Sequence, residues 1–485
     1  MEQQIKEEIS KGHYKVTSCR PTVISALGAI PKDTGDIRLI HDCSRPAGLS
    51  LNSYATVDKL SFTALDDATK HITRHTWLAK VDIKAAYRHV GIHPSMFTLT
   101  GLKCKFAGDQ NFTIFYDSRL PFGASQSVGC FHRITQSVVR MIKRRCKCRI
   151  VCYLDDFLII SDSRDRCQAS MDSLINLLQQ LGFTINRKKV VPPSQSLTFL
   201  GININCPEGT LSIPGDKLAE LKTFACNYIS KSKVTKRELQ RLIGKISWTS
   251  KCIKSLRPVL RSLIDLQAKL RKPSHRVRLP AASKNDIALF CDWCTSFNGV
   301  VFLPDTKTPL PATTLYTDAS LTAGAAFCNN DFLYCAWEFD FPELANEHIY
   351  VKEIWSALLA FRRWRKQWQN SAVHLFTDNK GTEWAIRKGT TRNKIANRAL
   401  KELLWIAAYN NIDVISHYIN TKDNYVADAL SRMHEPHYFN VSMTMLYRLG
   451  VDVSHPCFNW LHHMSYYTLA FLVLNRDSAR RTGVG

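Results

Sequence analysis

The chain has 485 residues, which is too long for one ordinary domain and predicts roughly three. Apolar residues make up 45% of it and charged residues 22%, a globular composition that excludes wholesale disorder. Lysine and arginine total 65 against 41 aspartates and glutamates, so the formal net charge is +24. This excess predicts a polyanionic partner, most often a nucleic acid, although an anionic membrane surface would also fit it.

Neither the start of the sequence nor its cysteines indicate secretion. Residues 1–8 are polar and partly acidic, unlike a signal peptide. The sixteen cysteines include one isolated C-x-x-C pair, Cys291 and Cys294, without a second pair at zinc-site spacing. The longest apolar run, residues 466–474, is far shorter than the ~20 residues that cross a bilayer. We therefore expect reduced, mostly buried thiols in an intracellular protein of the cytoplasm or nucleus, with no membrane span.

The first part of the chain mixes short strand-like runs with helical stretches. Residues 151–160 hold two β-rich runs separated only by Asp155 and Asp156, which predicts a hairpin with two acids at its tip. Asp82 lies where a strand-like run passes into a helix-prone one. Neighbouring carboxylates repel one another unless cations neutralise them, and sites made only of oxygen ligands favour Mg²⁺. These acids are a candidate cation site, although an isolated Asp-Asp pair is more often a solvated turn.

Residues 216–270 read as helices with a dense positive charge. The clearest helix begins at a capping box, Thr235-x-x-Glu238. Between Lys231 and Arg278 there are fifteen lysines and arginines and only two acids. A charge run is usually only a solvated face, but here an apolar stripe faces one way, which suits a helix laid along a phosphate backbone. The basic residues expected to face outward are Lys236, Arg237, Arg241 and Lys245.

Prolines punctuate residues 271–310, and a second compact unit follows. Residues 314–317 and 373–377 read as strands, and residues 353–368 and 425–432 as helices. Four acids lie in or next to these elements: Asp318, Glu353, Asp378 and Asp428. Taken singly, each is most simply a helix cap or a surface group.

Five segments resemble, in order, the polymerase motifs of retroelement reverse transcriptases. They are Ala79–Tyr87, Leu120–Gly123, Tyr153–Leu158, Leu181–Asn186 with Lys188-Lys189, and Phe199–Gly201. Residues 193–202 and 235–245 are most similar to DIRS-like retrotransposons, with gypsy-like elements and pararetroviruses as alternatives. The resemblance extends from about Gly28 to Arg432 and implies a right-hand polymerase with fingers, palm and a helical thumb.

The resemblance implies a role for each matching residue. Asp82, Asp155 and Asp156 would hold two Mg²⁺ ions, which Mn²⁺ can replace, with the carbonyl of Ile83 assisting. Tyr87 would be the steric gate that excludes a ribose 2′-hydroxyl. The other implied roles belong to Lys32 and Arg38 (triphosphate), Phe122 and Gly123 (nucleotide and template base), Lys189 or its neighbour Lys188 (pyrophosphate), and Phe199, Leu200 and Gly201 (primer grip).

The four acids of the second unit resemble the ribonuclease H site of the same retroelements. Asp318 lies in Thr-Asp-Ala-Ser, Asp378 in Thr-Asp-Asn, and Asp428 in Asn-x-x-x-Asp-Ala-Leu-Ser-Arg, while Glu353 is borne on a helix. Four carboxylates can hold two Mg²⁺ ions that position a water for attack on an RNA phosphodiester. Many relatives carry a mobile histidine ten residues before the last acid. Position 418 here is a tyrosine, so either His417 takes that part or the function is absent, and we expect it to be absent.

The expected fold is an α+β right-hand polymerase followed by an α/β ribonuclease H-like domain. Fingers and palm would occupy residues 1–205, the basic helical thumb 206–275, a connection 276–310 and the ribonuclease H domain 311–432, leaving 433–485 as a tail of unknown role. The expected activity is copying of RNA, then DNA, into DNA, with degradation of the RNA in the hybrid. The partners would be an RNA template, a DNA primer, the RNA–DNA hybrid and dNTPs, and the family implies a separate tyrosine recombinase and a capsid-like protein.

Two other hypotheses remain open. A domesticated protein would keep the fold and bind nucleic acid without catalysis, but the intact acids argue against it. A DNA-templated polymerase is the second, and Tyr87 together with the linked ribonuclease H motifs argues against that.

Overall fold

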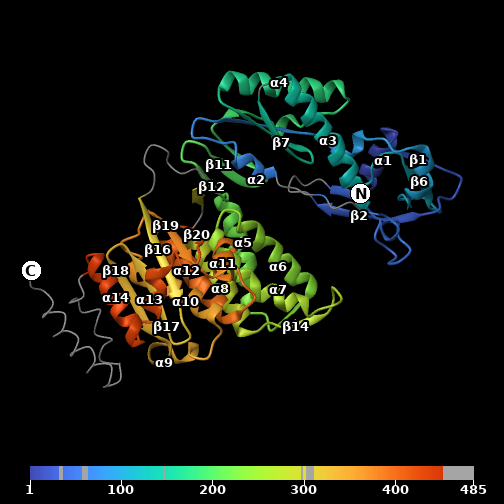
Figure 1. Cartoon of the computed structure of the whole chain (residues 1–485). Helices are drawn as coiled ribbons and strands as arrows, with labels where there is room; N and C mark the ends of the chain where they lie inside the picture. The colour runs from blue at the N-terminus through green and yellow to red at the C-terminus, as the bar shows by residue number, and fades with distance from the viewer. Residues whose placement is uncertain are drawn as a thin grey trace, which may run out of the picture. The chain divides into compact units, whose positions relative to one another are not determined.

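The computed structural model describes residues 1–31, 37–56, 60, 64–146, 148–296, 299–301 and 311–451. The chain divides into two compact units, which we name the N-terminal unit (residues 1–212 and 301–303) and the C-terminal unit (residues 213–300 and 304–485). Each unit has its own sheets and buried cores (Figure 1). No helix within the described ranges is long and apolar enough to cross a membrane.

A four-stranded antiparallel sheet of the N-terminal unit carries the acidic hairpin. Its strands, in spatial order, are β7 (Arg149–Tyr153), β8 (Asp156–Ser161), β4 (Trp77–Asp82) and β9 (Val191–Ser194). Alternate residues such as Val81 and Ile159 face α3 (Ser125–Arg145) and α4 (Arg164–Gln180), which bury Phe131 and Leu174 against them. The predicted hairpin is confirmed, but its tip is shifted by one residue: Leu154 and Asp155 form the turn, and Asp156 is the first residue of β8, paired with Tyr153.

A five-stranded sheet forms a second layer of the same unit. Its order is β1 (Tyr14–Val16), β6 (Thr113–Asp117), β5 (Gly101–Cys104), β2 (Ile24–Pro31) and β3 (Ile37–Asp42). Helix α1 (Glu2–Ser10) belongs to this layer, because its Ile5 packs with Leu39, Leu102 and Phe115 in one buried cluster.

The remaining elements of the N-terminal unit are short. A small sheet has the order β10 (Ser196–Phe199), β11 (Ile202–Asn205), β12 (Thr210–Ser212) and β15 (Val300–Val301). One α-helix, α2 (Ala64–Thr69), is joined by four 3₁₀ turns: η1 (Leu51–Ser53), η2 (Ala86–His89), η3 (Pro94–Leu99) and η4 (Arg187–Lys189).

The C-terminal unit begins with a group of helices. They are α5 (Gly215–Ile229), α6 (Lys236–Thr249), η5 (Lys254–Val259), α7 (Leu260–Ala268) and α8 (Ala281–Ser296), with the strand pair β13 (Lys233–Thr235) and β14 (Arg276–Arg278). The capping box is confirmed: the Glu238 N–H donates to the Thr235 hydroxyl, and the Thr235 N–H donates to the Glu238 carboxylate.

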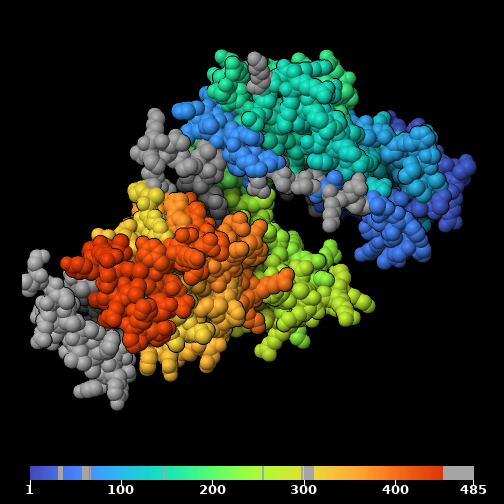
Figure 2. Space-filling model, viewed as in Figure 1, coloured from blue at the N-terminus to red at the C-terminus, as the bar shows by residue number. Residues whose placement is uncertain are grey.

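Helix α8 lies inside the segment that the sequence suggests to be a connection, residues 276–310. Pro280 immediately precedes the helix instead of interrupting it, and a proline at a helix start is compatible with the helix. Trp293 of α8 stacks on Trp405 with ring centroids 5.0 Å apart, and Asn397 donates to the carbonyl of Pro258 at 3.1 Å. The helical segment therefore packs directly on the part of the chain that follows it (Figure 2).

The rest of the C-terminal unit is a five-stranded mixed sheet. Its order is β18 (Asp331–Ala336), β17 (Ala323–Cys328), β16 (Ala312–Ala319), β19 (Ala372–Thr377) and β20 (Asp413–Tyr418), with β16, β19 and β20 parallel. One face packs on α10 (Ile349–Trp364) and α12 (Lys394–Tyr409) around Leu315, Val373 and Leu375. The other face packs on α13 (Tyr425–Ser431) and α14 (Pro436–Arg448) around Phe327 and Phe332. The remaining elements are α9 (Trp337–Asp340), η6 (Pro342–Leu344) and α11 (Lys380–Lys388).

The strands expected at 314–317 and 373–377 and the helix expected at 425–432 are confirmed. The helix expected from Glu353 instead begins at Ile349, because the ring of His348 accepts the N–H of Tyr350 and caps it. Of the segment left without a role, residues 433–451 add α14 to the sheet, whereas residues 452–485 lie outside the described part of the chain.

Candidate active sites

Strand register brings the three acids of the hairpin together. Asp82, the last residue of β4, pairs directly with Asp156, the first residue of β8. Asp155 lies in the turn before β8, and its carbonyl accepts the N–H of Ile83 at 3.1 Å. Asp82 is buried and the other two acids are partly buried, so the three carboxylates gather at one end of the sheet.

Two lysines lie beside these carboxylates. Lys80 Nζ lies 3.1 Å from Asp156 Oδ1, and Lys189 Nζ lies 3.2 Å from Asp82 Oδ2. Burial raises the pKa of Asp155 and of Asp156, and the charges of neighbouring carboxylates raise both further. Burial lowers the pKa of Lys189, but its hydrogen bond to Asp82 raises that pKa overall. Crowded, partly buried carboxylates fit a divalent cation, which would supply the missing positive charge.

Of the two candidate lysines, the structure places Lys189 at the carboxylates. Its ammonium group donates to Asp82, and Asn186 donates to the other oxygen of the same carboxylate at 2.8 Å. Lys188 is exposed. The turn η4 therefore directs the second lysine of the pair toward the acids.

Three of the residues predicted to bind the nucleotide lie together. The rings of Tyr87 and Phe122 stack with centroids 4.8 Å apart, and the guanidinium of Arg38 lies 5.7 Å from the centroid of the Phe122 ring. Gly123 has φ of 129°, and a Cβ there would lie 1.9 Å from the carbonyl oxygen of His41, so only glycine fits. Lys32 lies outside the described residues.

The predicted primer-grip residues form a hairpin turn. Leu200 and Gly201 have φ of 50° and 78° and connect Phe199 of β10 to Ile202 of β11, with which it pairs. Two consecutive positive φ angles are typical of a tight two-residue hairpin. Phe199 is fully buried, whereas the two turn residues, Leu200 and Gly201, are partly exposed.

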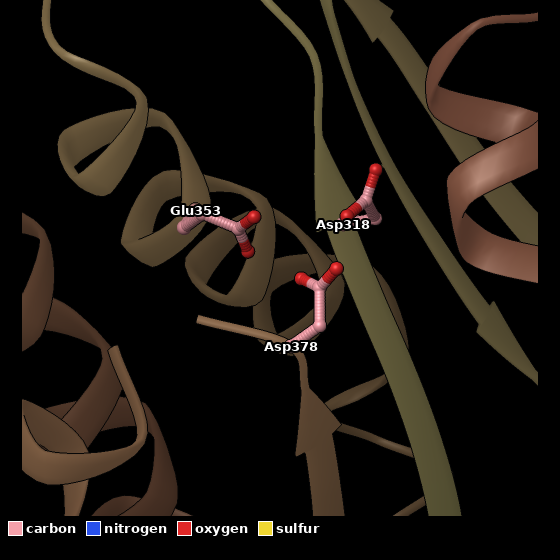
Figure 3. A group of neighbouring side chains, drawn as sticks. All are labelled: Asp318, Glu353 and Asp378. Carbon is pink, nitrogen blue, oxygen red and sulfur yellow. The ribbon is translucent and has the colours of Figure 1, made fainter. Parts of the chain in front are cut away.

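Three of the four acids of the C-terminal unit converge from separate elements. Asp318 lies on β16, Glu353 on α10 and Asp378 directly after β19, and each offers a carboxylate oxygen within 4.8 Å of the other two. Figure 3 shows their side chains directed toward one another. This spacing fits a divalent cation held by oxygen ligands.

Within the described part of the chain, the negative charges of this cluster have no lysine partners like those beside the hairpin acids. Burial, together with the charges of Asp378 and Asp428, raises the pKa of Asp318 to about 7. Burial and the charges of Asp318 and Asp378 raise the pKa of Glu353 well above its ordinary value. The neighbouring donors are hydroxyls: Ser431 to Asp318 at 2.5 Å, Thr377 to Glu353 at 3.3 Å and Thr421 to Asp378 at 2.7 Å.

Asp428 is not part of this group of three. Its carboxylate accepts from Arg432, one helical turn later, at 2.9 Å. Its charge nevertheless raises the pKa of Asp318, so it lies near enough to act on the cluster.

His417 contacts aromatic side chains of the neighbouring strand β19. Its ring stacks on Phe376 with centroids 4.7 Å apart, and its Nε2 lies 2.9 Å from Nδ1 of His374. Tyr418, the next residue, is exposed, with the ammonium of Lys380 4.9 Å from its ring centroid. Two aromatic neighbours, His374 and Phe376, therefore hold the ring of His417 in the sheet.

The basic residues of α6 lie on its solvent side. Arg237 and Arg241 are exposed, and Lys236 and Lys245 are partly exposed. Arg241 and Lys245 both approach the ring of Phe224 on α5, at 5.1 and 4.7 Å from its centroid. A cavity of about 310 Å³ beside them is lined by Phe224, Asn227, Tyr228, Lys231, Thr235, Arg237, Glu238 and Arg241.

Comparison with known proteins adds a family match to this geometry. Residues 30–204 match the family model for "Reverse transcriptase (RNA-dependent DNA polymerase)". We name this part of the chain the reverse-transcriptase domain, after the family that it matches. The chain is 26% identical over 251 residues to Protein P of Heron hepatitis B virus, covering 50% of this chain and 29% of that protein.

A second relative covers more of the chain. The Enzymatic polyprotein of Cestrum yellow leaf curling virus is 20% identical over 386 residues, covering 76% of this chain and 56% of that protein. The chain therefore spans 29% and 56% of the length of these two relatives.

Solved structures show the same fold. A foamy viral protease-reverse transcriptase in complex with double-stranded DNA matches 86% of this chain and 69% of its own at a TM-score of 0.51 and 14% identity. A second structure of that kind matches 86% of this chain and 82% of its own at a TM-score of 0.50. At this identity the likeness shows a reverse-transcriptase-like fold of mixed α and β structure.

Sequence reasoning missed several residues around both sites. In the reverse-transcriptase domain, Lys80 lies two residues before Asp82, and the two-residue period of a strand puts both on one face, so a signal for it existed. Asn186 belongs to the motif Leu181–Asn186, but the sequence did not assign this residue a role. In the C-terminal unit, three residues that contact the acids were missed: Ser431, Thr421 and Arg432. Of these, Arg432 could have been predicted, because it lies four residues after Asp428 and such residues are neighbours on a helix.

Proposed function

We propose that the chain is an RNA-directed and DNA-directed DNA polymerase that also degrades the RNA of RNA–DNA hybrids. The observation that carries the polymerase proposal is the pairing of Asp82 with Asp156 beside Asp155, next to the stacked Tyr87 and Phe122. The match of residues 30–204 to the reverse-transcriptase family supports it.

Different residues of the chain would have different roles in nucleotide addition. Two Mg²⁺ ions, or Mn²⁺ in their place, would be held by Asp82, Asp155 and Asp156 with the carbonyl of Ile83, and would activate a primer 3′-hydroxyl and stabilise the leaving pyrophosphate. Lys189 carries a proton beside Asp82 and would transfer it to that pyrophosphate. The ring of Tyr87, fixed against Phe122, would block a ribose 2′-hydroxyl, and Arg38, with Lys32, would bind the triphosphate.

Primer extension tests the polymerase proposal. Wild-type protein should extend a labelled DNA primer on an RNA template with Mg²⁺ and dNTPs, and Asp155→Asn should lose this activity. Asp162→Asn is the matched control, because Asp162 is an exposed acid in the same unit whose carboxylate pairs with exposed Arg166 at 2.8 Å and accepts from the Ser161 hydroxyl at 3.5 Å. A folded wild-type protein that binds primer–template but does not extend it would contradict the proposal and favour a domesticated binding protein. Extension on DNA templates alone would favour a DNA-templated polymerase.

The ribonuclease H proposal rests on the convergence of Asp318, Glu353 and Asp378 on a five-stranded mixed sheet. Divalent ions held there, with Asp428 contributing, would position a water for attack on an RNA phosphodiester. Thr421 and Ser431 would orient the two aspartates to which they donate.

Cleavage of a hybrid tests the second site separately. Wild-type protein should cut a 5′-labelled RNA strand annealed to DNA, and Asp378→Asn should abolish cutting while leaving primer extension intact. Asp413→Asn, at an exposed acid on β20, is the matched control. Cleavage that survives Asp378→Asn would contradict the assignment of this site.

We also propose that the chain belongs to a DIRS-like retrotransposon and acts inside the cell on RNA template, DNA primer and their hybrid. The motifs at residues 193–202 and 235–245 support this placement, whereas the two relatives reported above are viral proteins, so a pararetroviral origin is the alternative. The DIRS-like placement implies a separately encoded tyrosine recombinase and a capsid-like protein. A tyrosine-recombinase gene next to the coding sequence would support it, and its absence would favour the viral alternative.

A further inference from the structure

A buried ionic network lies outside both acidic sites and centres on Arg88. The side chain of Arg88 is only 8% exposed, and its guanidinium lies between two carboxylates. Its Nη1 donates to Asp117 Oδ2 at 2.7 Å, and its Nε donates to Glu8 Oε2 at 2.8 Å. Asp117 is fully buried, and its other oxygen accepts the N–H of Arg119 at 2.9 Å.

Three further side chains belong to the network. Nδ1 of His13 lies 2.8 Å from Glu8 Oε2, the oxygen that accepts from Arg88. The hydroxyl of Tyr14 lies 2.9 Å from Nε2 of His41, and that nitrogen lies 3.6 Å from Asp117 Oδ2. The guanidinium of Arg88 lies 5.3 Å from the centroid of the Tyr14 ring. The network therefore connects α1, β1, β3 and β6 to the turn η2 that follows Asp82.

Because the network is buried, its charged groups must be accurately placed relative to one another. A buried charge is tolerated only when its partners are well placed, and a guanidinium offers a planar fork of donors with fixed directions. Arg88 presents separate nitrogens of that fork to Glu8 and Asp117, which fixes both the position and the rotation of the group. An apolar side chain could fill the same space without this orientation.

Both aromatic residues of the proposed nucleotide site are tied to the network. Arg88 follows Tyr87 directly in the chain. On the other side, the N–H of His41 donates to the carbonyl of Phe122 at 2.7 Å, and the carbonyl of His41 occupies the space that a Cβ on Gly123 would need. The stack of Tyr87 on Phe122 is therefore held from one side through Arg88 and from the other through His41.

We propose that Arg88, held by Glu8 and Asp117, is a positioning residue that sets Tyr87 against Phe122 and thereby determines how strongly the polymerase prefers dNTPs to rNTPs. This inference rests on the proposed polymerase function, in which Tyr87 is the steric gate. It assigns helix α1 a part in nucleotide selection, because Glu8 supplies one of the two carboxylates.

Single-nucleotide primer extension with dNTP and rNTP tests this role. Arg88→Met should lower the ratio of kcat/KM for dNTP over rNTP by about tenfold, with a raised KM for dNTP and a smaller change in kcat. Arg88→Lys keeps the positive charge but not the planar fork of donors, so its dNTP/rNTP ratio should lie between those of the wild type and Arg88→Met. Tyr14→Phe removes one hydroxyl and should give a change of about twofold in the same direction. Tyr87→Ala is the positive control for lost discrimination.

A matched control separates positioning from general destabilisation. Leu102→Ala removes buried volume from the apolar cluster that contains Tyr14 and leaves every charged group of the network in place. It should lower the melting temperature and leave the dNTP/rNTP ratio unchanged. A ratio that falls as far in Leu102→Ala as in Arg88→Met, or an unchanged ratio in soluble Arg88→Lys and Tyr14→Phe, overturns the inference.

A structural measurement keeps the inference independent of activity. If wild-type protein does not incorporate dNTPs, the proposed polymerase function fails, and the positioning role is then judged on a crystal structure of Arg88→Lys. A displaced Tyr87 ring, no longer stacked on Phe122, supports the role. Rings in their wild-type arrangement overturn it.

Discussion

The two acidic sites differ in what compensates their carboxylates. At the reverse-transcriptase site, the ammonium groups of Lys80 and Lys189 lie within about 3 Å of Asp156 and Asp82. In the cluster of the C-terminal unit, hydroxyl groups are the donors, and they come from Ser431, Thr377 and Thr421.

The difference between ammonium and hydroxyl donors determines what a metal ion would have to displace at each site. A neighbouring ammonium stabilises an ionised carboxylate by charge, whereas a hydroxyl only donates a hydrogen bond. A metal ion at the first site would therefore compete with lysine contacts, and a metal ion at the second site would compete with protons. Asp318 belongs to the second site, and its pKa is raised to about 7 by burial and by the charges of Asp378 and Asp428. Its carboxyl group therefore keeps a proton up to about neutral pH.

The largest expected effect is the complete separation of the two activities. Asp155→Asn should lower primer extension on the order of 1,000-fold and leave hybrid cleavage within about twofold, and Asp378→Asn should do the reverse. Each substitution removes a carboxylate from one site only. The measurement is both assays on the same preparations. Loss of both activities in either variant would show that the two sites depend on each other.

A smaller effect concerns pH and Mg²⁺ at the C-terminal cluster. Because the folded-state pKa of Asp318 is raised, its contribution to stability is present below about pH 4 and is lost as the pH rises through about 7. Mg²⁺ binds the ionised acids, so it should raise the melting temperature more at pH 8 than at pH 6, by at least about 2–4 °C, which corresponds to roughly 1 kcal/mol.

Differential scanning calorimetry with Mg²⁺ and with EDTA checks this prediction. Asp318→Asn should remove most of the pH dependence of the Mg²⁺ effect. Asp155→Asn should retain it, because the lysines already compensate the first site. An equal Mg²⁺ effect at both pH values in the wild type would contradict the proton-for-metal exchange.

Lys80 offers a test of the lysine-for-metal exchange. Lys80→Met removes the ammonium that competes with a metal for Asp156, so half-maximal primer extension should need about fivefold less Mg²⁺. Lys84→Met is the matched control, because Lys84 is exposed and lies two residues beyond Asp82. A higher Mg²⁺ requirement in Lys80→Met would show that Lys80 supports the metal site instead of competing with it.

The smallest expected effect links the two sites. Arg241→Ala removes one exposed cation from α6 and should lower primer extension and hybrid cleavage by a similar factor of about two, because both proposed activities require a bound duplex. The salt dependence of hybrid binding, measured as log K against log[salt], should lose about one unit of slope. Arg140→Ala, at an exposed arginine of α3, is the control. A loss confined to one activity would place α6 beside that site alone.

Much of both sites could be predicted from the sequence because local signals mark them. The acidic hairpin followed from two β-rich runs separated by two residues, to within one residue of its turn, and the Thr235 capping box marked the start of α6. The register that puts Asp82 opposite Asp156 could not be predicted in this way, because strand pairing depends on packing against α3 and α4.

The sequence by itself determined the order of elements, the positive charge and the identity of the acids, since these depend on residue type and spacing along the chain. Only the tertiary structure decided which partners each acid has. Lys80, Ser431 and Thr421 reach the carboxylates through folding, and Arg88 meets Glu8 across 80 positions of sequence. Those contacts join distant segments in a buried interior, where charge and hydrogen-bond geometry are decided by what packs alongside.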